Sequence, residues 1–134
     1  KYAVHCGGGM NHRIGLFDMI LIKENHIASC GSIKAAMEKA QAVDAAIEIE
    51  IEVRDLDELQ QALEAGAKRI LLDNFSIADL QQAVTINQQQ AELEVSGNVT
   101  LENIRDYALT GIDYISSGSI TKHLHALDLS MQFI

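Results

Sequence analysis

Residues 47–75 read IEIEIEVRDLDELQQALEAGAKRILLDNF, and this stretch decides the fold class. Two apolar runs, 47–53 and 69–72, have the length and composition of strands, and three leucines at helical spacing lie between them. Asp55 is a good helix N-cap, and Gly66 stands where a left-handed residue would end the helix. The stretch therefore predicts a β–α–β unit with parallel strands and a right-handed crossover.

The same alternation of strands and helices continues on both sides of this unit. Further strands are expected at 19–22, 92–95 and 114–116, and further helices, capped by Ser32, Ser76 and Thr100, at 32–43, 77–84 and 101–108. The apolar stretch 127–134 is expected to add a final strand. Such units fit an open doubly wound sheet or a (β/α) barrel, and a whole barrel usually needs about 250 residues. We therefore predict a single α/β domain over 1–134, either an open sheet or an incomplete barrel.

The composition excludes several classes of protein. The chain has 134 residues, of which 48% are apolar and 22% charged. That is enough for one globular core, and it is unlike disordered, collagen-like or disulfide-stapled chains. No run approaches the length of a membrane span, and the N-terminus lacks the apolar core of a signal peptide. We expect a soluble, cytosolic protein with Cys6 and Cys30 as reduced thiols.

The charge is strongly acidic but unevenly distributed. A formal net charge of −9 argues against nucleic acid or an anionic membrane as a partner. Within residues 1–23, however, Lys1, Arg13 and Lys23 are opposed only by Asp18. A small cationic region inside an acidic protein predicts a small anionic ligand.

Polar and glycine residues stand at the carboxyl ends of the expected strands, where ligands bind in both candidate architectures. They are Lys23, Glu52, Asp73, Ser96, Gly97, Asn98, Ser117 and Gly118. Carboxylates hold Mg²⁺, a lysine neutralises anionic charge, and Gly or Ser turns present backbone N–H groups to phosphate. The set predicts a site for a metal-bound, phosphate-bearing anion, and ordinary turn chemistry is the alternative.

The strand at 47–53 alternates isoleucine with glutamate, although a buried parallel strand is normally apolar throughout. One interpretation is a half-exposed edge strand with solvated glutamates. The other places the isoleucines against helices and the glutamates on an inner face. Three carboxylates on one buried face need cations or a metal nearby, and Lys23 and Arg13 are the candidate cations.

Residues 7–13, GGGMNHR, form a glycine-rich loop that matches neither phosphate-binding fingerprint. At its end, His12 and Arg13 offer a donor and a bidentate fork suited to carboxylate recognition. Lys23 could alternatively form a Schiff base, as in barrel aldolases, with Asn25 and its neighbour His26 shaping the loop.

A zinc site is a further alternative. It would use Cys6, His12, His26 and Cys30, but their spacing matches no closed zinc motif.

Six segments in chain order carry a resemblance to a known family. They are KYAVHCGGGMNHRIGL, LIKENHI, EIEVRDLDEL, AGAKRILLDNF, LEVSGNVT and TGIDYISSGSITKHLHALDLSMQFI. Together, from residue 1 to 134, they resemble quinolinate phosphoribosyltransferase, or nicotinate-nucleotide pyrophosphorylase (carboxylating). The resemblance implies synthesis of nicotinate mononucleotide, pyrophosphate and CO₂ from quinolinate and phosphoribosyl pyrophosphate with Mg²⁺, in de novo NAD synthesis. It also implies a fold in which an N-terminal α/β sandwich is followed by an incomplete (β/α) barrel. This chain would be the barrel, and the sandwich would be absent from it.

The resemblance assigns roles residue by residue. His12 and Arg13 would bind the quinolinate carboxylates, and Lys23 would face the substrate and sugar-phosphate anions. Glu52 and Asp73 would hold the ribose hydroxyls and Mg²⁺, so that Lys23, Glu52 and Asp73 are the implied catalytic residues. Phosphate would be bound through the backbone N–H groups of Ser96, Gly97, Asn98, Ser117, Gly118 and Ser119.

The sequence departs from the family in two respects. SSGS at 116–119 stands where SVGA is commoner, a change that keeps Gly118. The family's sandwich and Thr-Arg-Lys motif, whose regions supply further quinolinate-binding arginines, one of them across a dimer interface, are not in this sequence. We therefore expect the C-terminal part of a homodimeric or larger enzyme. The alternatives are a non-catalytic fragment of that enzyme and a molybdenum-linked paralogue with another substrate.

Overall fold

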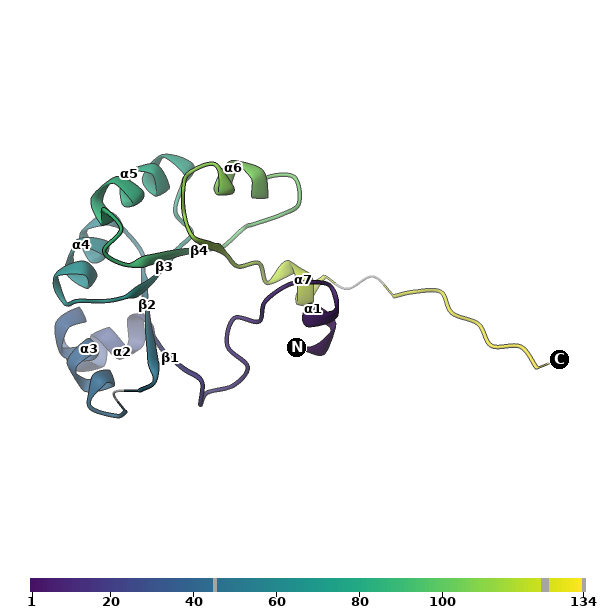
Figure 1. Ribbon diagram of the computed structural model, residues 1–134, viewed down its shortest axis with the longest axis horizontal. Helices are drawn as coiled ribbons and strands as arrows, with labels where there is room; N and C mark the ends of the chain where they lie inside the picture. Colours follow the sequence, from purple (N-terminus) through teal and green to yellow (C-terminus); the bar gives the residue numbers. More distant parts are fainter. Residues whose placement is uncertain (45, 124–125, 134) are drawn as a thin grey trace.

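The computed structural model describes residues 1–44, 46–123 and 126–133, and five strands form one parallel sheet (Figure 1). They are β1 (Met19–Ile22), β2 (Glu48–Val53), β3 (Arg69–Asp73), β4 (Glu92–Ser96) and β5 (Tyr114–Ile115). Each strand predicted between residues 19 and 116 is present. The alternation of strands and helices in the sequence therefore predicts all five strands of the sheet correctly.

Helices connect and cover these strands. They are α1 (Tyr2–Cys6), α2 (Glu24–Cys30), α3 (Ile33–Gln41), α4 (Leu56–Glu64), α5 (Ile77–Asn87), α6 (Ile104–Ala108) and α7 (Ser119–Lys122). The caps predicted for three of them are confirmed, because Ser32, Asp55 and Ser76 each accept a hydrogen bond from the backbone N–H three residues ahead. None of the described helices is long and apolar enough to cross a membrane.

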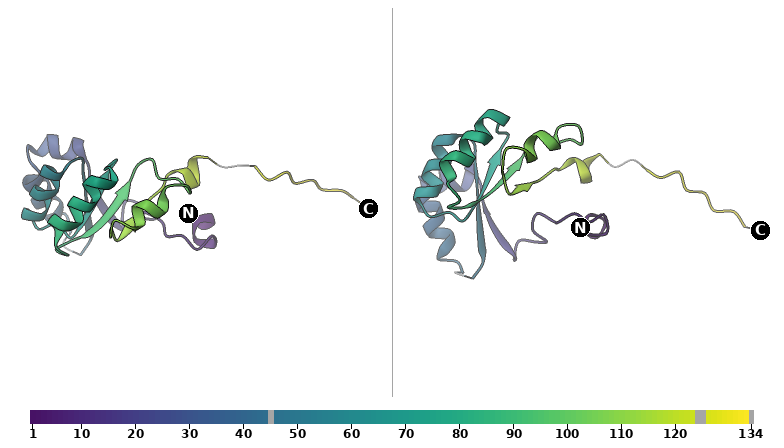
Figure 2. Two further views of the ribbon diagram at one scale, coloured as in Figure 1. Left: turned by 90° about the horizontal axis from the view of Figure 1, so that it is seen from above. Right: turned by 45° about the horizontal axis from the view of Figure 1, so that its top comes forward.

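The strand order distinguishes the two α/β architectures. In a doubly wound sheet the order reverses at a switch point and helices cover both faces. Here β1 to β5 pair in chain order, the sheet curves, and α2 to α6 lie on its outer side (Figures 1 and 2). Within the described residues β5 does not pair with β1, so the ring is open. The prediction of an incomplete barrel is confirmed, and the doubly wound alternative is wrong.

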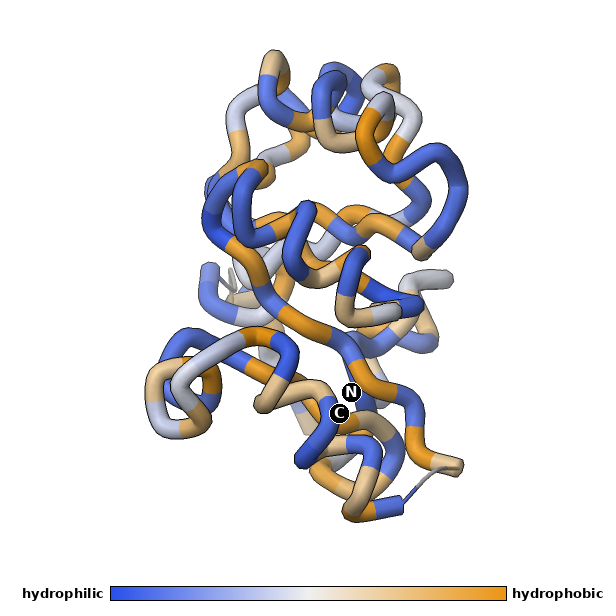
Figure 3. Tube along the Cα trace, turned by 90° about the vertical axis from the view of Figure 1, so that its left-hand side faces the viewer, coloured by the Kyte–Doolittle hydropathy of each residue, from blue (hydrophilic) through white to orange (hydrophobic). Residues whose placement is uncertain are grey.

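The main core lies between the outer face of the sheet and its helices. Ile51 of β2 is fully buried in it, as are Ile70, Leu72 and Val95 of the next two strands. β2 is hydrogen-bonded on both sides, to β1 and to β3, so the edge-strand interpretation is wrong. Its isoleucines join the core and its glutamates face the inside of the open ring. Apolar and polar segments accordingly mix along the chain in Figure 3.

The helix before β5 begins later than predicted. Thr100 is not its cap, since α6 starts at Ile104. Asn103 Oδ1 accepts a hydrogen bond from the Thr100 N–H at 2.8 Å, and Asn103 Nδ2 donates to the Asn98 carbonyl at 3.0 Å. These two bonds fold 98–103 into a turn, which takes up the residues expected to form the first helical turn.

The short helix α2 lies where a loop was predicted. Lys23 precedes it, and the Lys23 backbone N–H donates to His26 Nδ1 at 2.9 Å, which closes a capping box. Gly31 ends the helix in the left-handed conformation, with φ of 87°. Seven residues are too few for a clear helical period, and α1 and α7, which are shorter still, were missed for the same reason.

The final strand predicted at 127–134 is not formed in the described residues. Residues 126–133 run away from the sheet in an extended line without strand pairing, and residue 134 lies outside the described residues (Figures 1 and 2). Leu127 and Phe133, for example, are 81% and 91% exposed. An alternating apolar pattern becomes a strand only where a sheet edge pairs with it, and these residues meet none in this structure.

Candidate active site

A cavity of about 600 Å³ opens at the carboxyl ends of the strands, inside the ring. Its wall includes His12, Lys23, Glu52, Ser96, Ser117 and Gly118. A cavity of about 670 Å³ lies at the amino ends of the strands, with Lys68 and Glu92 in its wall. We assign the site to the first cavity, because (β/α) folds bind ligands at the carboxyl ends and the predicted residues gather there.

Lys23 and Glu52 form an ion pair across this cavity wall. Lys23 follows β1 directly, and its Nζ donates to Glu52 Oε2 at 2.5 Å. The Glu52 side chain is only 12% exposed, whereas the Lys23 side chain is 45% exposed. The pair therefore presents a cation at the mouth of the cavity and a carboxylate deeper inside.

Asp73, at the end of β3, is held by hydrogen bonds to both of its oxygens. Ser96 Oγ donates to Oδ1 at 3.2 Å, and Asn74 Nδ2 donates to Oδ2 at 2.9 Å. Asn98 Nδ2 in turn donates to Asn74 Oδ1 at 3.2 Å. Asp73, Gly97 and Asn98 were predicted to contact ligand, but the structure does not place them on the cavity wall. Here Asn98 supports Asp73 through Asn74.

Gly97 is required by this arrangement, and replacing it with alanine should be costly. Its φ is +96°, and an added Cβ would lie 2.2 Å from Asn74 Oδ1. We expect Gly97→Ala to destabilise the protein by about 2 kcal/mol or more, since backbone strain adds to the clash. Gly66→Ala is the matched control, with φ of +80° and nothing within 4 Å of the new Cβ. Urea midpoints measured together should fall further for Gly97→Ala, and equal shifts would contradict the close approach to Asn74.

The segment after β5 brings small residues to the cavity. Ser117 Oγ donates to the Val99 carbonyl at 2.9 Å and lies 2.7 Å from Ser119 Oγ. Ser117 and Gly118 are on the cavity wall, and Gly118 directly precedes α7. The structure thus brings Ser117 and Gly118 to the site and places Ser119 behind them, in contact with Ser117.

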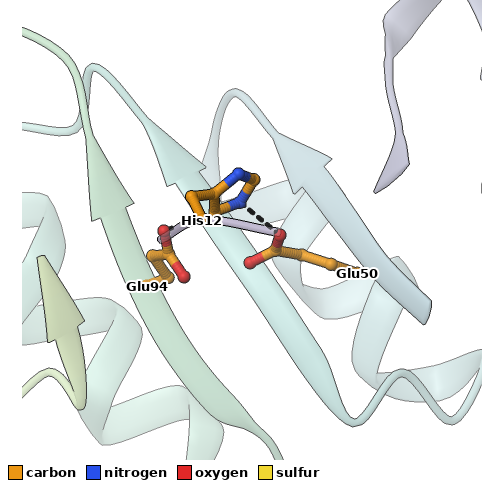
Figure 4. A group of neighbouring side chains, drawn as sticks. All are labelled: His12, Glu50 and Glu94. Atoms are coloured by element: carbon orange, nitrogen blue, oxygen red, sulfur yellow. Dashed lines mark hydrogen bonds and ion pairs between the residues drawn. The ribbon is translucent and has the colours of Figure 1, made fainter. Parts of the chain in front are cut away.

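At the cavity wall, His12 and three side chains of the sheet form a partly buried ionic network, and Figure 4 draws His12 with two of them, Glu50 and Glu94. His12 Nε2 lies 2.7 Å from Glu50 Oε2 and 3.7 Å from Glu94 Oε1. Arg69 bridges the same carboxylates, with 3.2 Å to Glu50 and 2.7 Å to Glu94. Glu50 and Glu94 are 0% and 1% exposed, and the guanidinium also lies 4.6 Å from the Tyr114 ring.

The network shifts the titration of both of its bases. The hydrogen bond to Glu50 raises the pKa of His12 above its ordinary value, and burial opposes this rise. The charges of Glu50 and Glu94 reinforce the rise, and the charge of Arg69 opposes it. Burial lowers the pKa of Arg69, but the hydrogen bond to Glu94 and the surrounding carboxylates outweigh burial and raise it.

The sequence reasoning chose one cation correctly and missed another. Lys23 does pair with a glutamate of β2, but Arg13 Nη1 donates to the Met19 carbonyl at 3.2 Å instead. Arg69 takes the expected place of Arg13 beside the glutamates. Arg69 is the first residue of β3, at the end of the strand opposite to the ligand site, but it is four residues before Asp73 and so shares its face of the strand.

His12, Glu50 and Glu94 are close enough to resemble a metal site, with ligand atoms within 4.8 Å of one another. Arg69 already donates to both carboxylates, so a cation would have to displace the guanidinium. We do not treat this group as a metal centre. Within the described residues His12 is also not grouped with Cys6, His26 and Cys30, so the zinc alternative is not supported.

Glu52 and Asp73 are the residues suited to a hard divalent cation. Glu52 pairs in register with Leu71, two residues before Asp73, so both carboxylates end neighbouring strands on one face. Mg²⁺ commonly takes one or two carboxylates and completes its shell with water and substrate phosphates. Each carboxylate has more acceptor positions than its hydrogen bonds in the structure use, so the donor set fits Mg²⁺.

Comparison with known proteins agrees with this geometry. Residues 1–132 match the family model for the quinolinate phosphoribosyl transferase C-terminal domain. A probable nicotinate-nucleotide pyrophosphorylase (carboxylating) of Bacillus subtilis is 43% identical over 132 residues, which cover 98% of this chain and 46% of that protein. The nicotinate-nucleotide pyrophosphorylase (carboxylating) of Mycobacterium leprae is 42% identical over 134 residues, and the match covers 98% of this chain and 47% of that protein.

A solved structure of the Francisella tularensis nicotinate-nucleotide pyrophosphorylase is similar to this structure over 96% of this chain and 46% of that one, with 55% sequence identity and a TM-score of 0.91. This chain thus spans about half the length of these relatives. Because the model of the family's C-terminal domain covers nearly all residues of this chain, the chain belongs to the quinolinate phosphoribosyltransferase family and corresponds to the C-terminal domain of its members.

Proposed function

We propose that the full encoded protein converts quinolinate and phosphoribosyl pyrophosphate into nicotinate mononucleotide, pyrophosphate and CO₂, a step of de novo NAD synthesis. The observation that carries the proposal is the cavity on whose wall His12, Lys23 and Glu52 come together with Ser117 and Gly118. Cations for an anionic acid, a carboxylate for the reacting centre and small residues for phosphate thus share one space. Family membership and the names of the relatives support the same reaction.

The chemistry asks mainly for placed charges. Departure of pyrophosphate from the ribose C1 leaves an oxocarbenium-like transition state, which preorganised carboxylates stabilise. Glu52, largely shielded from solvent beside Lys23, faces the developing positive charge. Asp73, which accepts a hydrogen bond from Ser96 of the cavity wall, would hold the ribose hydroxyls. His12 and Lys23 orient the dianionic acid so that its ring nitrogen attacks C1. Decarboxylation follows once that nitrogen is quaternised.

Arg13 completes the anion-binding group in this proposal. It lies beside His12 on the wall of a third cavity, of about 440 Å³, which adjoins the proposed site, and its guanidinium donates a hydrogen bond to the Met19 carbonyl. A guanidinium can bind a carboxylate through two parallel hydrogen bonds. If the Arg13 side chain rotates away from the Met19 carbonyl, its guanidinium can bind a carboxylate of quinolinate in this way.

Glu52 and Asp73 would hold Mg²⁺, which neutralises pyrophosphate charge as the bond to ribose breaks. Ser96 positions Asp73 for this role. Backbone N–H groups of the turns at 96–98 and 117–119 would bind phosphate.

Other readings of the site carry less support. A Schiff base at Lys23 would need a free amine, whereas its ammonium is paired with Glu52, and the family is not one of aldolases. A molybdenum-linked paralogue would share the fold but take another substrate. A non-catalytic fragment would fold without turnover.

The decisive experiment supplies the purified full encoded protein with quinolinate, phosphoribosyl pyrophosphate and Mg²⁺. We expect nicotinate mononucleotide, pyrophosphate and CO₂ in equal amounts, with no turnover when nicotinate replaces quinolinate. Absence of product from quinolinate would contradict the proposal. Omitting Mg²⁺ with a chelator should abolish turnover.

We further propose that the protein is a cytosolic homodimer or larger homo-oligomer. Large apolar side chains are exposed in the loop before β1, for example Leu16 at 81% and Phe17 at 74%. Such exposed apolar surface is typical of a protein interface, which supports association with another subunit. The mass of the native particle measures this directly.

A further inference from the structure

The ionic network of His12, Glu50, Arg69 and Glu94 lies under the cavity, and the proposed reaction uses only His12 from it. The four side chains come from four separate parts of the chain: the glycine-rich loop, β2, β3 and β4. Glu50 and Glu94 are nearly inaccessible, and the Arg69 side chain is 19% exposed. Burying so many ionisable groups is unfavourable unless their charges balance.

The charges balance only when His12 is protonated. Two buried carboxylates meet one guanidinium, which leaves one negative charge without a partner. Glu48 also approaches Arg69, at 3.5 Å, but its side chain is 52% exposed and its charge is solvated. His12 is the remaining base in the group, and its Nε2 lies beside both buried carboxylates. The imidazolium therefore completes the neutral set.

The geometry also fixes which part of His12 is available to a ligand. Nε2 is engaged with Glu50 at 2.7 Å, and the other ring nitrogen, Nδ1, points away from both carboxylates (Figure 4). His12 is on the wall of the cavity, above the network. In the imidazolium both nitrogens are donors, so Nδ1–H is free to bind an anion. In the neutral ring, donation from Nε2 to Glu50 would turn Nδ1 into an acceptor, which repels a carboxylate.

We propose that Glu50, Arg69 and Glu94 are positioning residues that hold His12 as a fixed imidazolium, so that its Nδ1–H remains a donor for an anionic ligand at neutral pH. The groups that face His12 are Glu50 from β2, Arg69 from β3 and Glu94 from β4. Their summed effect, described above, is a raised pKa of His12, which agrees with this role. Only the identity of the ligand, quinolinate, rests on the proposed function.

The test is an NMR titration of His12 in the full encoded protein and in its Glu50→Gln variant. We expect the His12 pKa to fall by about one unit or more in Glu50→Gln, since a neighbouring carboxylate within hydrogen-bond reach shifts a pKa by about one to three units. Glu58→Gln is the matched control, because Glu58 also pairs with an arginine, Arg54, but on the outer side of the sheet. It should leave the His12 titration unchanged. An unchanged His12 pKa in Glu50→Gln would overturn the proposal.

A second variant guards against misfolding of the first. Glu94→Gln removes the more distant carboxylate, 3.7 Å from His12, and should lower the pKa in the same direction but less. Glu50→Asp keeps the charge and should restore most of the pKa lost in Glu50→Gln. If neither glutamine variant shifts the titration, or the aspartate fails to rescue it, the network does not set the charge of His12.

Steady-state kinetics separate this role from simple structural support. At about pH 7.5, Glu50→Gln should raise KM for quinolinate at least about tenfold, with a smaller change in kcat, and the KM difference should shrink at about pH 6, where His12 regains its proton. Equal losses at both pH values would contradict the proposal. If quinolinate is not a substrate at all, the NMR titration still stands, so failure of the proposed function and failure of the network remain distinct.

Discussion

Replacing Glu52 with glutamine is expected to lower kcat/KM for quinolinate and phosphoribosyl pyrophosphate at least about a hundredfold in the full encoded protein. The glutamine keeps the shape of the side chain but loses the negative charge beside the proposed reacting carbon. Glu52 Oε2 also accepts the 2.5 Å hydrogen bond from Lys23 Nζ, so the variant leaves that cation unpaired at the cavity wall. Initial rates of pyrophosphate release at several concentrations of both substrates measure the effect.

Glu48→Gln is the matched control for this variant. Glu48 stands on the same strand and the same face as Glu52, but at the opposite end and with a 52% exposed side chain. We expect kcat/KM to change less than about threefold, as for most exposed positions away from a site. If Glu52→Gln behaves like Glu48→Gln, the carboxyl end of β2 is structural and the proposed chemistry is wrong.

The alternation of residues 47–53 shows how much the sequence could say about this site. A period of two places the glutamates on one face and the isoleucines on the other, and the place of Glu52 at the carboxyl end of the strand singles it out among them. The same rule applied backwards from Asp73 reaches Arg69, so the missed cation was within reach of a pattern argument. Arg69 begins its strand, so the balancing charge lies deeper in the ring than the strand ends that ligands contact.

Other parts of the site left no local signal in the sequence. His12 meets Glu50, 38 residues away, because the loop before β1 folds back inside the ring. The support of Asp73 by Asn74 and Asn98 depends on left-handed backbone at both asparagines, with φ of 57° and 53°. Asparagine tolerates this conformation, but spacing does not reveal that a given asparagine adopts it. Such features follow from contacts between residues far apart in the chain, and local sequence patterns do not indicate these contacts.

The second large effect is expected from Arg69→Met, which should destabilise the domain by about 3 to 5 kcal/mol. Methionine fills a similar volume but leaves Glu50 and Glu94 buried with only His12 to balance them. Arg54→Met removes an arginine paired with Glu58, but its side chain is 64% exposed and the pair is screened by solvent, so we expect a much smaller loss of stability. Hydrogen exchange of the β2 to β4 amides measures both losses in the full encoded protein.

The origin of the Arg69→Met loss can be checked through its pH dependence and its suppressors. The charge of Arg69 lowers the pKa of His12, so losing the guanidinium raises that pKa further above its ordinary value. The variant is therefore less destabilised at about pH 6 than at about pH 8, because the folded state then holds a proton on His12 that offsets one of the unpaired carboxylates. Adding Glu94→Gln should recover part of the stability, since it removes one of the unpaired charges. A loss that is independent of pH and unrelieved by Glu94→Gln would mean that Arg69 stabilises the sheet by packing, for instance on Tyr114, and that charge balance is not what holds the network together.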